Sequence, residues 1–155
     1  MRISRRILAG LATASLAVTA TSCGGGSKTA SFDKEVTVGI LHSLSGVMSI
    51  SEKTLVETEK MAIAEINAAG GINIDGESYE IKYVVEDGAS NWPLFAEKAG
   101  QMIDAGYPVI FGGWTSASRD AMEPVFESKK GFLYYPIQYE GRECSNNIMY
   151  TGATP

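Results

Sequence analysis

Short segments rich in β-branched residues alternate with helix-forming segments over most of the chain, and this alternation constrains the fold most strongly. Strands are predicted in EVTVGILHSLSG, GINIDGESYEIKYVVEDGAS, YPVIFGG, GFLYYP and NIMYTG. Helices are predicted in SISEKTLVETEKMAIAEINAAGG, WPLFAEKAGQMIDAG and SASRDAMEPVFESKK. Repeated strand and helix alternation builds a parallel sheet with helices on both faces. The sequence therefore predicts an α/β fold with a doubly wound parallel sheet.

Local signals define the boundaries of several predicted elements. Ser49 and Glu52 have the spacing of a capping box at the start of the first helix, and Asn91 opens the second helix. Asp75-Gly76 is typical of a tight turn before the second strand. The first helix has apolar residues at helical spacing. They are Leu55, Met61, Ala62, Ile66 and Ala69.

The N-terminus has the organisation of an export signal. Three arginines in the first six residues precede the uncharged run ILAGLATASLAVTA, and small residues then lead to Cys23. We interpret residues 1–22 as a lipoprotein signal peptide, Cys23 as the lipidated residue and residues 23–34 as a flexible tether. Ala20 stands where such signals usually carry Leu, so plain signal cleavage is the alternative. A partial twin-arginine pattern leaves the export route open between Sec and twin-arginine.

Charge and composition exclude several classes of function. Without the export signal, 10 lysines and arginines against 18 acidic residues give a formal charge of −8. An acidic chain without a basic cluster repels phosphate backbones, so nucleic acid is not an expected partner. With Cys23 in the anchor, Cys144 has no partner for a disulfide or a thiolate metal cluster, and His42 is the only histidine. We therefore expect no metal and no cofactor.

The loops at the carboxyl ends of the strands are where an open parallel sheet binds its ligands. These loops contain neither GxxxxGK[ST] nor GxGxxG, which disfavours a nucleotide enzyme. They offer hydroxyl, amide and aromatic side chains instead, which suit a small, neutral, polar solute. The side chains of this kind are Ser43, Ser45, Trp114, Thr115, Ser116, Ser118, Tyr135, Gln138 and Tyr139.

Structural roles compete with these binding roles. Either hydroxyl of Thr115-Ser116 can cap the third helix, and Trp114 can simply pack against the core. Asp87 can contact a ligand or cap the helix that follows it. Glu140 and Arg142 can form a solvated ion pair. The residues alone leave these alternatives open.

An exported hydrolase and a ligand-sensing regulator are the competing classes of function. A serine of TSAS would be the hydrolase's nucleophile, and His42 would have to be its base. No G-x-S-x-G elbow is present, so we expect a protein that is not an enzyme. The export signal disfavours a regulator that binds a protein partner.

Six segments together resemble the first lobe of type I periplasmic-binding-protein-like solute receptors of ABC transporters. They are VGILHSLSG, MAIAEINAAGGI, VVEDGASNWPLFAEKA, VIFGGWTSASRDAMEPVFE, YYPIQYEG and NIMYTGATP. The resemblance is strongest to the branch that binds urea and short-chain amides. It implies an extracytoplasmic receptor, lipid-anchored outside the cell membrane or periplasmic, that hands urea or a short amide to a membrane permease. The ligand contacts implied by the resemblance are Trp114, Thr115, Ser116, Tyr135 and Gln138, with weaker claims for Ile137 and Tyr139.

A branched-chain amino acid receptor of the same family is the alternative. Such receptors tend to offer a small residue and then a Thr in the loop after the fourth strand, where they hold the ligand's carboxylate and ammonium. The corresponding places here resemble Tyr135 and Ile137, which favours urea. Proteins of the family have two lobes, so the resemblance also implies that residues 35–155 form only the first lobe and end before the second.

Overall fold

The computed structural model describes residues 31–154, so the predicted export signal, Cys23 and most of the predicted tether lie outside the described residues. The elements are β1 (Lys34–His42), α1 (Ser49–Ala68), β2 (Ile72–Ile74), β3 (Glu77–Asp87), α2 (Trp92–Asp104), β4 (Ile110–Gly112), α3 (Ser116–Lys129), β5 (Leu133–Tyr135) and β6 (Ile148–Tyr150). Within this range, no helix combines the length and the apolar character needed to cross a membrane.

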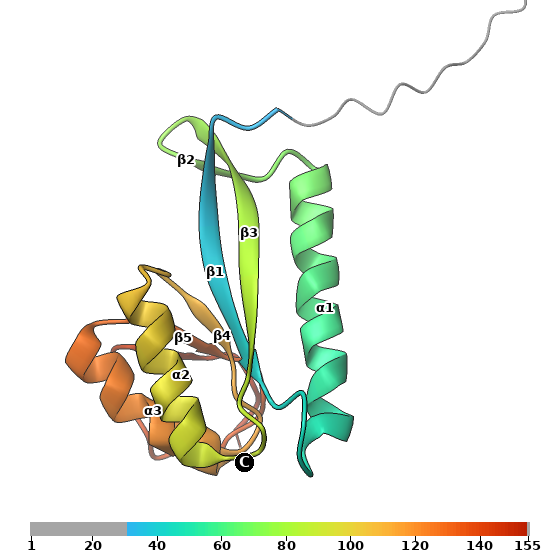
Figure 1. The fold of residues 1–155 in the computed structure, drawn as a ribbon. Coiled ribbons are helices and arrows are strands. Elements are labelled where there is room, and N and C mark those ends of the chain that lie inside the picture. Colours follow the sequence, from blue (N-terminus) through green and yellow to red (C-terminus); the bar gives the residue numbers. More distant parts are fainter. Residues whose placement is uncertain (1–30, 155) are drawn as a thin grey trace, which may run out of the picture.

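The strands form one sheet in the order β2-β3-β1-β4-β5-β6. All neighbouring strands are parallel except β2 and β3, which are antiparallel. Helix α1 covers one face of the sheet, and α2 and α3 pack against each other on the opposite face (Figure 1). This arrangement confirms the predicted doubly wound α/β fold. The order changes direction at β1, from which the chain continues to β3 on one side and later to β4 on the other.

The β2–β3 hairpin lies at the edge of the sheet. Its first strand, β2, is the strand that the sequence analysis did not predict as a separate element. Asp75 and Gly76 both have positive φ, 53° and 89°, as the predicted tight turn requires. Strand β2 precedes this turn and pairs with the start of β3, from Ile72 opposite Tyr79. Strand β2 is only three residues long, which is too short for an alternating pattern to stand out.

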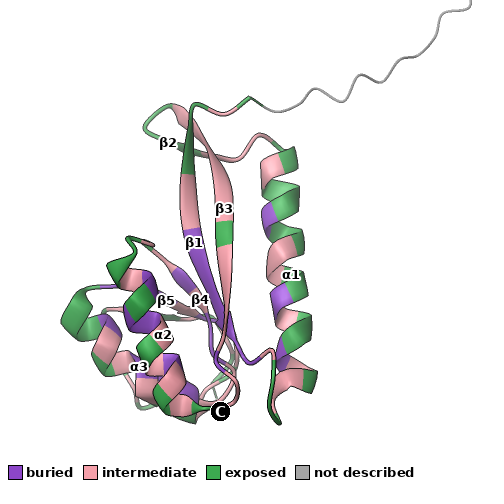
Figure 2. Ribbon diagram, in the orientation of Figure 1, coloured by how far each residue is buried: buried purple, intermediate pink, exposed green. Residues whose placement is uncertain are grey.

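Two apolar clusters hold the helices to the sheet. The cluster beneath α2 and α3 contains Leu41, Phe95, Ala99, Met102, Ile110, Met122, Phe126, Leu133, Tyr135 and Ile148. The cluster beneath α1 contains only Val38, Ile40, Val56 and Ile63. Figure 2 shows buried residues along α2, α3 and the second half of β1, whereas α1 is mostly exposed or intermediate. The face that bears α2 and α3 therefore carries most of the core.

The predicted first helix is confirmed as α1, but the apolar residues noted at helical spacing are not the ones that the sheet buries. Met61 and Ile66 are 57% and 39% exposed, whereas the buried apolar residues are Val56 and Ile63. The helix is apolar around much of its surface, so the sequence pattern did not define a single face. The position of the sheet decides which apolar side chains are buried.

The predicted capping box is wrong, whereas the predicted cap of α2 is confirmed. The N-cap residue of α1 is Met48, and no side chain caps this end. The Glu52 carboxylate turns towards β1 instead and is fully buried there. At α2, the Asn91 side chain accepts a hydrogen bond from the Leu94 N–H at 3.2 Å.

Candidate ligand-binding site

The predicted binding loops meet at the carboxyl edge of the sheet. His42 at the end of β1 lies opposite Asp87 at the end of β3, and Leu41 lies opposite Gly112 at the end of β4. The end of the described chain reaches the same edge (Figure 1). These ends bring the exit loops together, as the parallel topology requires.

Gly112 permits the close approach of β4 to β1 at this edge. A Cβ atom on Gly112 would lie 2.0 Å from the Leu41 carbonyl oxygen, which no side chain tolerates. The same carbonyl accepts a hydrogen bond from the Gly113 N–H at 3.0 Å. The glycine pair therefore fixes the direction in which the chain leaves β4 and enters α3.

Thr115 is the N-cap of α3. Its hydroxyl oxygen accepts a hydrogen bond from the Ser118 N–H at 3.0 Å, and its backbone is extended. Ser118 is buried, and its hydroxyl donates to the Thr115 carbonyl at 2.7 Å. Of the two hydroxyls that the sequence left open as caps, Thr115 therefore has the structural role. Its predicted contact with a ligand stays a prediction.

Ser116 joins the exit loop of β4 to that of β5. Its hydroxyl lies 2.6 and 2.7 Å from the two carboxylate oxygens of Glu140, to which it donates. This hydrogen bond holds the pKa of the Glu140 carboxyl below its usual value. The predicted ion pair between Glu140 and Arg142 is wrong, because Glu140 is bonded to Ser116 and lies 3.4 Å from the Arg119 guanidinium.

Arg119 lies beneath the Ser116–Glu140 hydrogen bond that joins the two exit loops. The sequence analysis did not identify this arginine as a candidate. Its side chain is 2% exposed, and its guanidinium carbon lies 4.9 Å from the ring centroid of Tyr135 and 5.7 Å from that of Tyr139. The same guanidinium lies 2.5 Å from the carboxylate of Glu143. Arg119 stands three residues after Ser116, so the two share one side of α3, which was the available signal.

Tyr135 supports the loops from beneath. It is fully buried, and its hydroxyl donates to the Trp114 carbonyl at 3.0 Å. Burial raises the pKa of this phenol, so the hydroxyl remains a donor at neutral pH. Tyr135 therefore positions the backbone of Trp114, whose side chain is partly exposed.

A polar hollow of about 280 Å³ lies beside the junction of Ser116 and Glu140. It is lined by Gln138, Tyr139, Glu140, Ala153 and Thr154. The Tyr139 N–H donates to the Ala153 carbonyl at 3.2 Å, which closes one wall. Next to the hollow, the rings of Tyr139 and Tyr150 are stacked with centroids 4.4 Å apart. Gln138 and Glu140 both line the hollow, and Glu140 is hydrogen-bonded to Ser116. Gln138 therefore lies near Ser116.

The comparisons with known proteins agree with this architecture. Residues 36–155 match the family model of the periplasmic binding protein domain. The chain belongs to this family. The matched residues include the loops after β4 and β5 and the whole of the described sheet from Val36 onward.

Solved structures of this family superpose on the chain. A branched-chain amino acid transporter substrate-binding protein of Streptococcus pneumoniae, in complex with isoleucine, is 24% identical with a TM-score of 0.60, over 66% of this chain and 28% of that chain. A leucine-binding protein of Thermotoga maritima is 24% identical with a TM-score of 0.57, over 65% and 27%. An ABC-type branched-chain amino acid transporter protein of Rhodopseudomonas palustris is 22% identical with a TM-score of 0.62, over 77% and 33%. These identities show the fold, and the chain spans a third or less of each relative.

The serines and the acid after β1 and β3 build the loops of this periplasmic binding protein domain. Asp87 accepts hydrogen bonds from the Leu44 N–H at 2.8 Å and from the Ser45 hydroxyl at 2.7 Å. Burial raises the pKa of Asp87, but these bonds outweigh it and hold the pKa below its usual value. Asp87 therefore does not cap α2 as one alternative predicted. The Ser43 hydroxyl accepts from the Ser90 N–H at 3.0 Å, which ties the two loops together.

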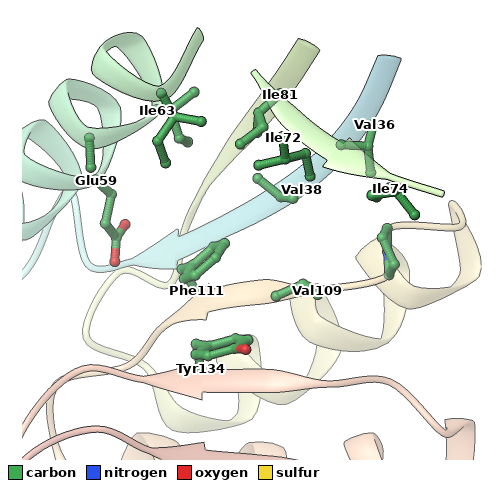
Figure 3. Close-up of a pocket in the computed structure, with 13 residues that line it drawn as sticks. Val36, Val38, Glu59, Ile63, Ile72, Ile74, Ile81, Val109, Phe111 and Tyr134 are labelled. Atoms are coloured by element: carbon green, nitrogen blue, oxygen red, sulfur yellow. The ribbon is translucent and has the colours of Figure 1, made fainter. Parts of the chain in front are cut away.

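A larger groove, of about 500 Å³, lies between α1 and the sheet, away from the exit loops (Figure 3). Its walls are apolar apart from the Glu59 carboxylate and the Tyr134 hydroxyl. They consist of Val36, Val38, Ala62, Ile63, Ile66, Ile72, Ile74, Ile81, Pro108, Val109 and Phe111. Such walls provide few polar groups to orient a polar solute. The junction of the β4 and β5 loops is therefore the better candidate site.

Proposed function

We propose that this chain is the first ligand-binding lobe of an extracytoplasmic receptor that delivers a small polar solute to the permease of an ABC transporter. Membership of the periplasmic binding protein domain family supports the proposal, as do the relatives named as transporter binding proteins. The observation that carries it is the meeting of Ser116 and Glu140 beside a hollow with polar and aromatic walls.

The geometry favours binding over catalysis. The two ring nitrogens of His42 lie 3.2 Å from the Glu52 carboxylate and 3.1 Å from the Glu59 carboxylate. Both N–H groups are thus committed to carboxylates, so His42 has no free nitrogen with which to activate a serine. Within residues 31–154, no three His, Cys, Asp or Glu side chains are placed to hold a metal ion.

Urea or a short-chain amide is the ligand that we propose. Gln138 and Tyr139 offer amide and aromatic groups at the hollow, and the Ser116 hydroxyl lies beside it against Glu140; such groups match a small planar solute. The carboxylates of Asp120, Glu140 and Glu143 surround the buried Arg119 and make this edge unfavourable for an anion.

A branched-chain amino acid is the second candidate, favoured by the relatives with isoleucine, leucine or branched-chain amino acids in their names. The Ser116 hydroxyl already bonds a carboxylate, that of Glu140. The carboxylate of an amino acid can take the same hydroxyl if Glu140 moves away. The two candidates therefore differ in whether Glu140 stays in the occupied site.

Calorimetry on the complete receptor with urea, acetamide, formamide, leucine and isoleucine tests the ligand class. Urea or an amide is expected to bind most tightly. Tightest binding of leucine or isoleucine would establish the second candidate, and turnover of an amide to ammonia would contradict the assignment as a receptor.

The site residues are tested by a pair of adjacent hydroxyl variants. Ser116→Ala is expected to weaken ligand binding about 3- to 30-fold, the range for one neutral hydrogen bond, with little change in melting temperature. Thr115→Ala is expected to show the opposite pattern, because it removes the helix cap and costs about 0.5–2 kcal/mol of stability. Calorimetry and thermal unfolding of both variants measure the two effects. Unchanged affinity in Ser116→Ala would mean that this hydroxyl serves only the fold.

Attachment to the membrane is proposed through lipid on Cys23, after removal of residues 1–22. The proposal rests on the sequence pattern, since this segment lies outside the described residues. The permease and the membrane are therefore the proposed macromolecular partners.

A further inference from the structure

The Glu140 carboxylate is held at the edge of the hollow with part of its hydrogen-bonding capacity unused. Its side chain is 71% exposed although the Ser116 hydroxyl lies within 2.7 Å of both oxygens. A hydroxyl has one hydrogen to donate, whereas an ionised carboxylate has about four lone-pair sites. The Arg119 guanidinium also donates to Glu140, at 3.4 Å, so part of the acceptor capacity of Glu140 remains free at the hollow.

Neutralising Arg119 does not require Glu140. The guanidinium lies 2.5 Å from the Glu143 carboxylate and 3.4 Å from that of Glu140. Glu143 is also the better buried of the two acids, with a side chain 23% exposed. An ion pair is stronger when its charges are closer together and less exposed to solvent. Glu143 is therefore the principal counterion of Arg119. Neutralisation of Arg119 thus does not account for the placement of Glu140, whose bond with Ser116 also joins the two exit loops.

We infer that Glu140 is the acceptor in this lobe for the N–H groups of the ligand, and that it selects solutes rich in N–H donors over solutes that carry a free carboxylate. Ser116 orients Glu140 for this role. The inference rests on the proposed function as a solute receptor and adds the residue that determines specificity.

The chemistry of a carboxylate fits the proposed ligands. Two N–H groups of urea, or one of an amide, can donate to the Glu140 oxygens in the plane of the carboxylate, as charge-assisted hydrogen bonds. A ligand carboxylate at the same place meets a like charge and competes for the Ser116 hydroxyl. The ammonium of an amino acid would be accepted by Glu140, but the carboxylate two bonds away from its nitrogen would be repelled.

The variant Glu140→Gln tests this inference in the complete receptor. Glutamine keeps the shape of the side chain, removes the charge and replaces one acceptor oxygen by a donor. Urea affinity is expected to fall about tenfold or more, the range for a hydrogen bond to a charged group, and discrimination against leucine is expected to narrow. Glu57→Gln is the matched control, because Glu57 is 72% exposed on α1 and is expected to leave both affinities unchanged.

The outcomes separate the two proposals. Weaker urea binding by Glu140→Gln alone, at an unchanged melting temperature, supports the inference. Wild-type urea affinity in Glu140→Gln, or tighter binding, overturns the inference and leaves the receptor assignment intact. A wild-type receptor that binds neither urea nor an amide overturns the proposed ligand, and the inference with it. A second variant, Glu140→Asp, keeps the charge and is expected to retain part of the selectivity against leucine.

Discussion

Replacing His42 with alanine is expected to lower the free energy of unfolding by about 3–5 kcal/mol, the range for removing one partner of a buried ion pair. His42 and Glu52 are both 0% exposed, and the imidazole Nδ1 lies 3.2 Å from the Glu52 carboxylate. The same carboxylate oxygen accepts from the Ser43 N–H at 2.7 Å. Without the imidazole, the buried Glu52 side chain would keep only the hydrogen bond from the Ser43 N–H.

Denaturant unfolding of wild type and His42→Ala measures this loss. The control is Lys60→Ala, which breaks an exposed pair with Glu57 on α1 and is expected to cost less than about 1 kcal/mol. A loss of similar size in the two variants would contradict the account of a charged, buried cluster.

The stabilising effect of His42 is expected to depend on pH. Burial lowers the pKa of His42, but the hydrogen bonds to Glu52 and Glu59 outweigh burial and raise the pKa above 6.5. A folded-state pKa above the unfolded value means that the contribution is fully present below about pH 6.5 and is lost as the pH rises through the folded-state pKa. The difference in stability between wild type and His42→Ala should therefore shrink at alkaline pH. A difference that is constant from pH 5 to 10 would contradict the charged imidazole.

Arg119→Met is expected to have the largest combined effect on stability and ligand binding. Methionine keeps much of the buried volume but removes the cation that lies over Tyr135 and Tyr139 and pairs with Glu143. We expect a loss of about 2–3 kcal/mol, below the fully buried limit because Glu143 is partly exposed. Ligand affinity is expected to fall about tenfold or more, since the loop that carries Gln138 and Glu140 loses the attachments made by Arg119 and keeps only those such as the Ser116–Glu140 bond.

Thermal unfolding and calorimetry of Arg119→Met measure these two losses. Lys98→Met, which breaks the partly exposed pair with Glu86, provides a matched loss of one cation. Equal behaviour of the two variants would mean that Arg119 neither supports the β5 exit loop nor affects the site.

The fold could be predicted because its signals are local. The β-branched residues of β1 predict a strand, and the Asn91 cap predicts the start of α2. Neither prediction needs information on distant residues. The role of Glu52 could not be predicted, because its partner His42 lies ten residues away and meets it only after α1 packs on the sheet. A local rule, the capping box, was therefore overridden by a tertiary contact.

The location of the candidate site could be predicted from the sequence, whereas several of the contacts within it could not. The rule that parallel sheets bind ligands at their carboxyl edge predicted that Ser116 and Gln138 lie near one another, as they do; their contact with a ligand stays a prediction. Arg119 and the bond between Ser116 and Glu140 were not predicted, because they join α3 to a loop more than 20 residues later. Sequence spacing along a helix carries no information on which loop will face it.

The crystal structure of the complete receptor with bound urea or acetamide tests the central claim most directly. The account predicts a ligand between the β4 and β5 exit loops, with its nitrogen within about 3 Å of a Glu140 carboxylate oxygen. A ligand that contacts neither Ser116 nor Glu140, or that occupies the apolar groove beneath α1, would contradict the account.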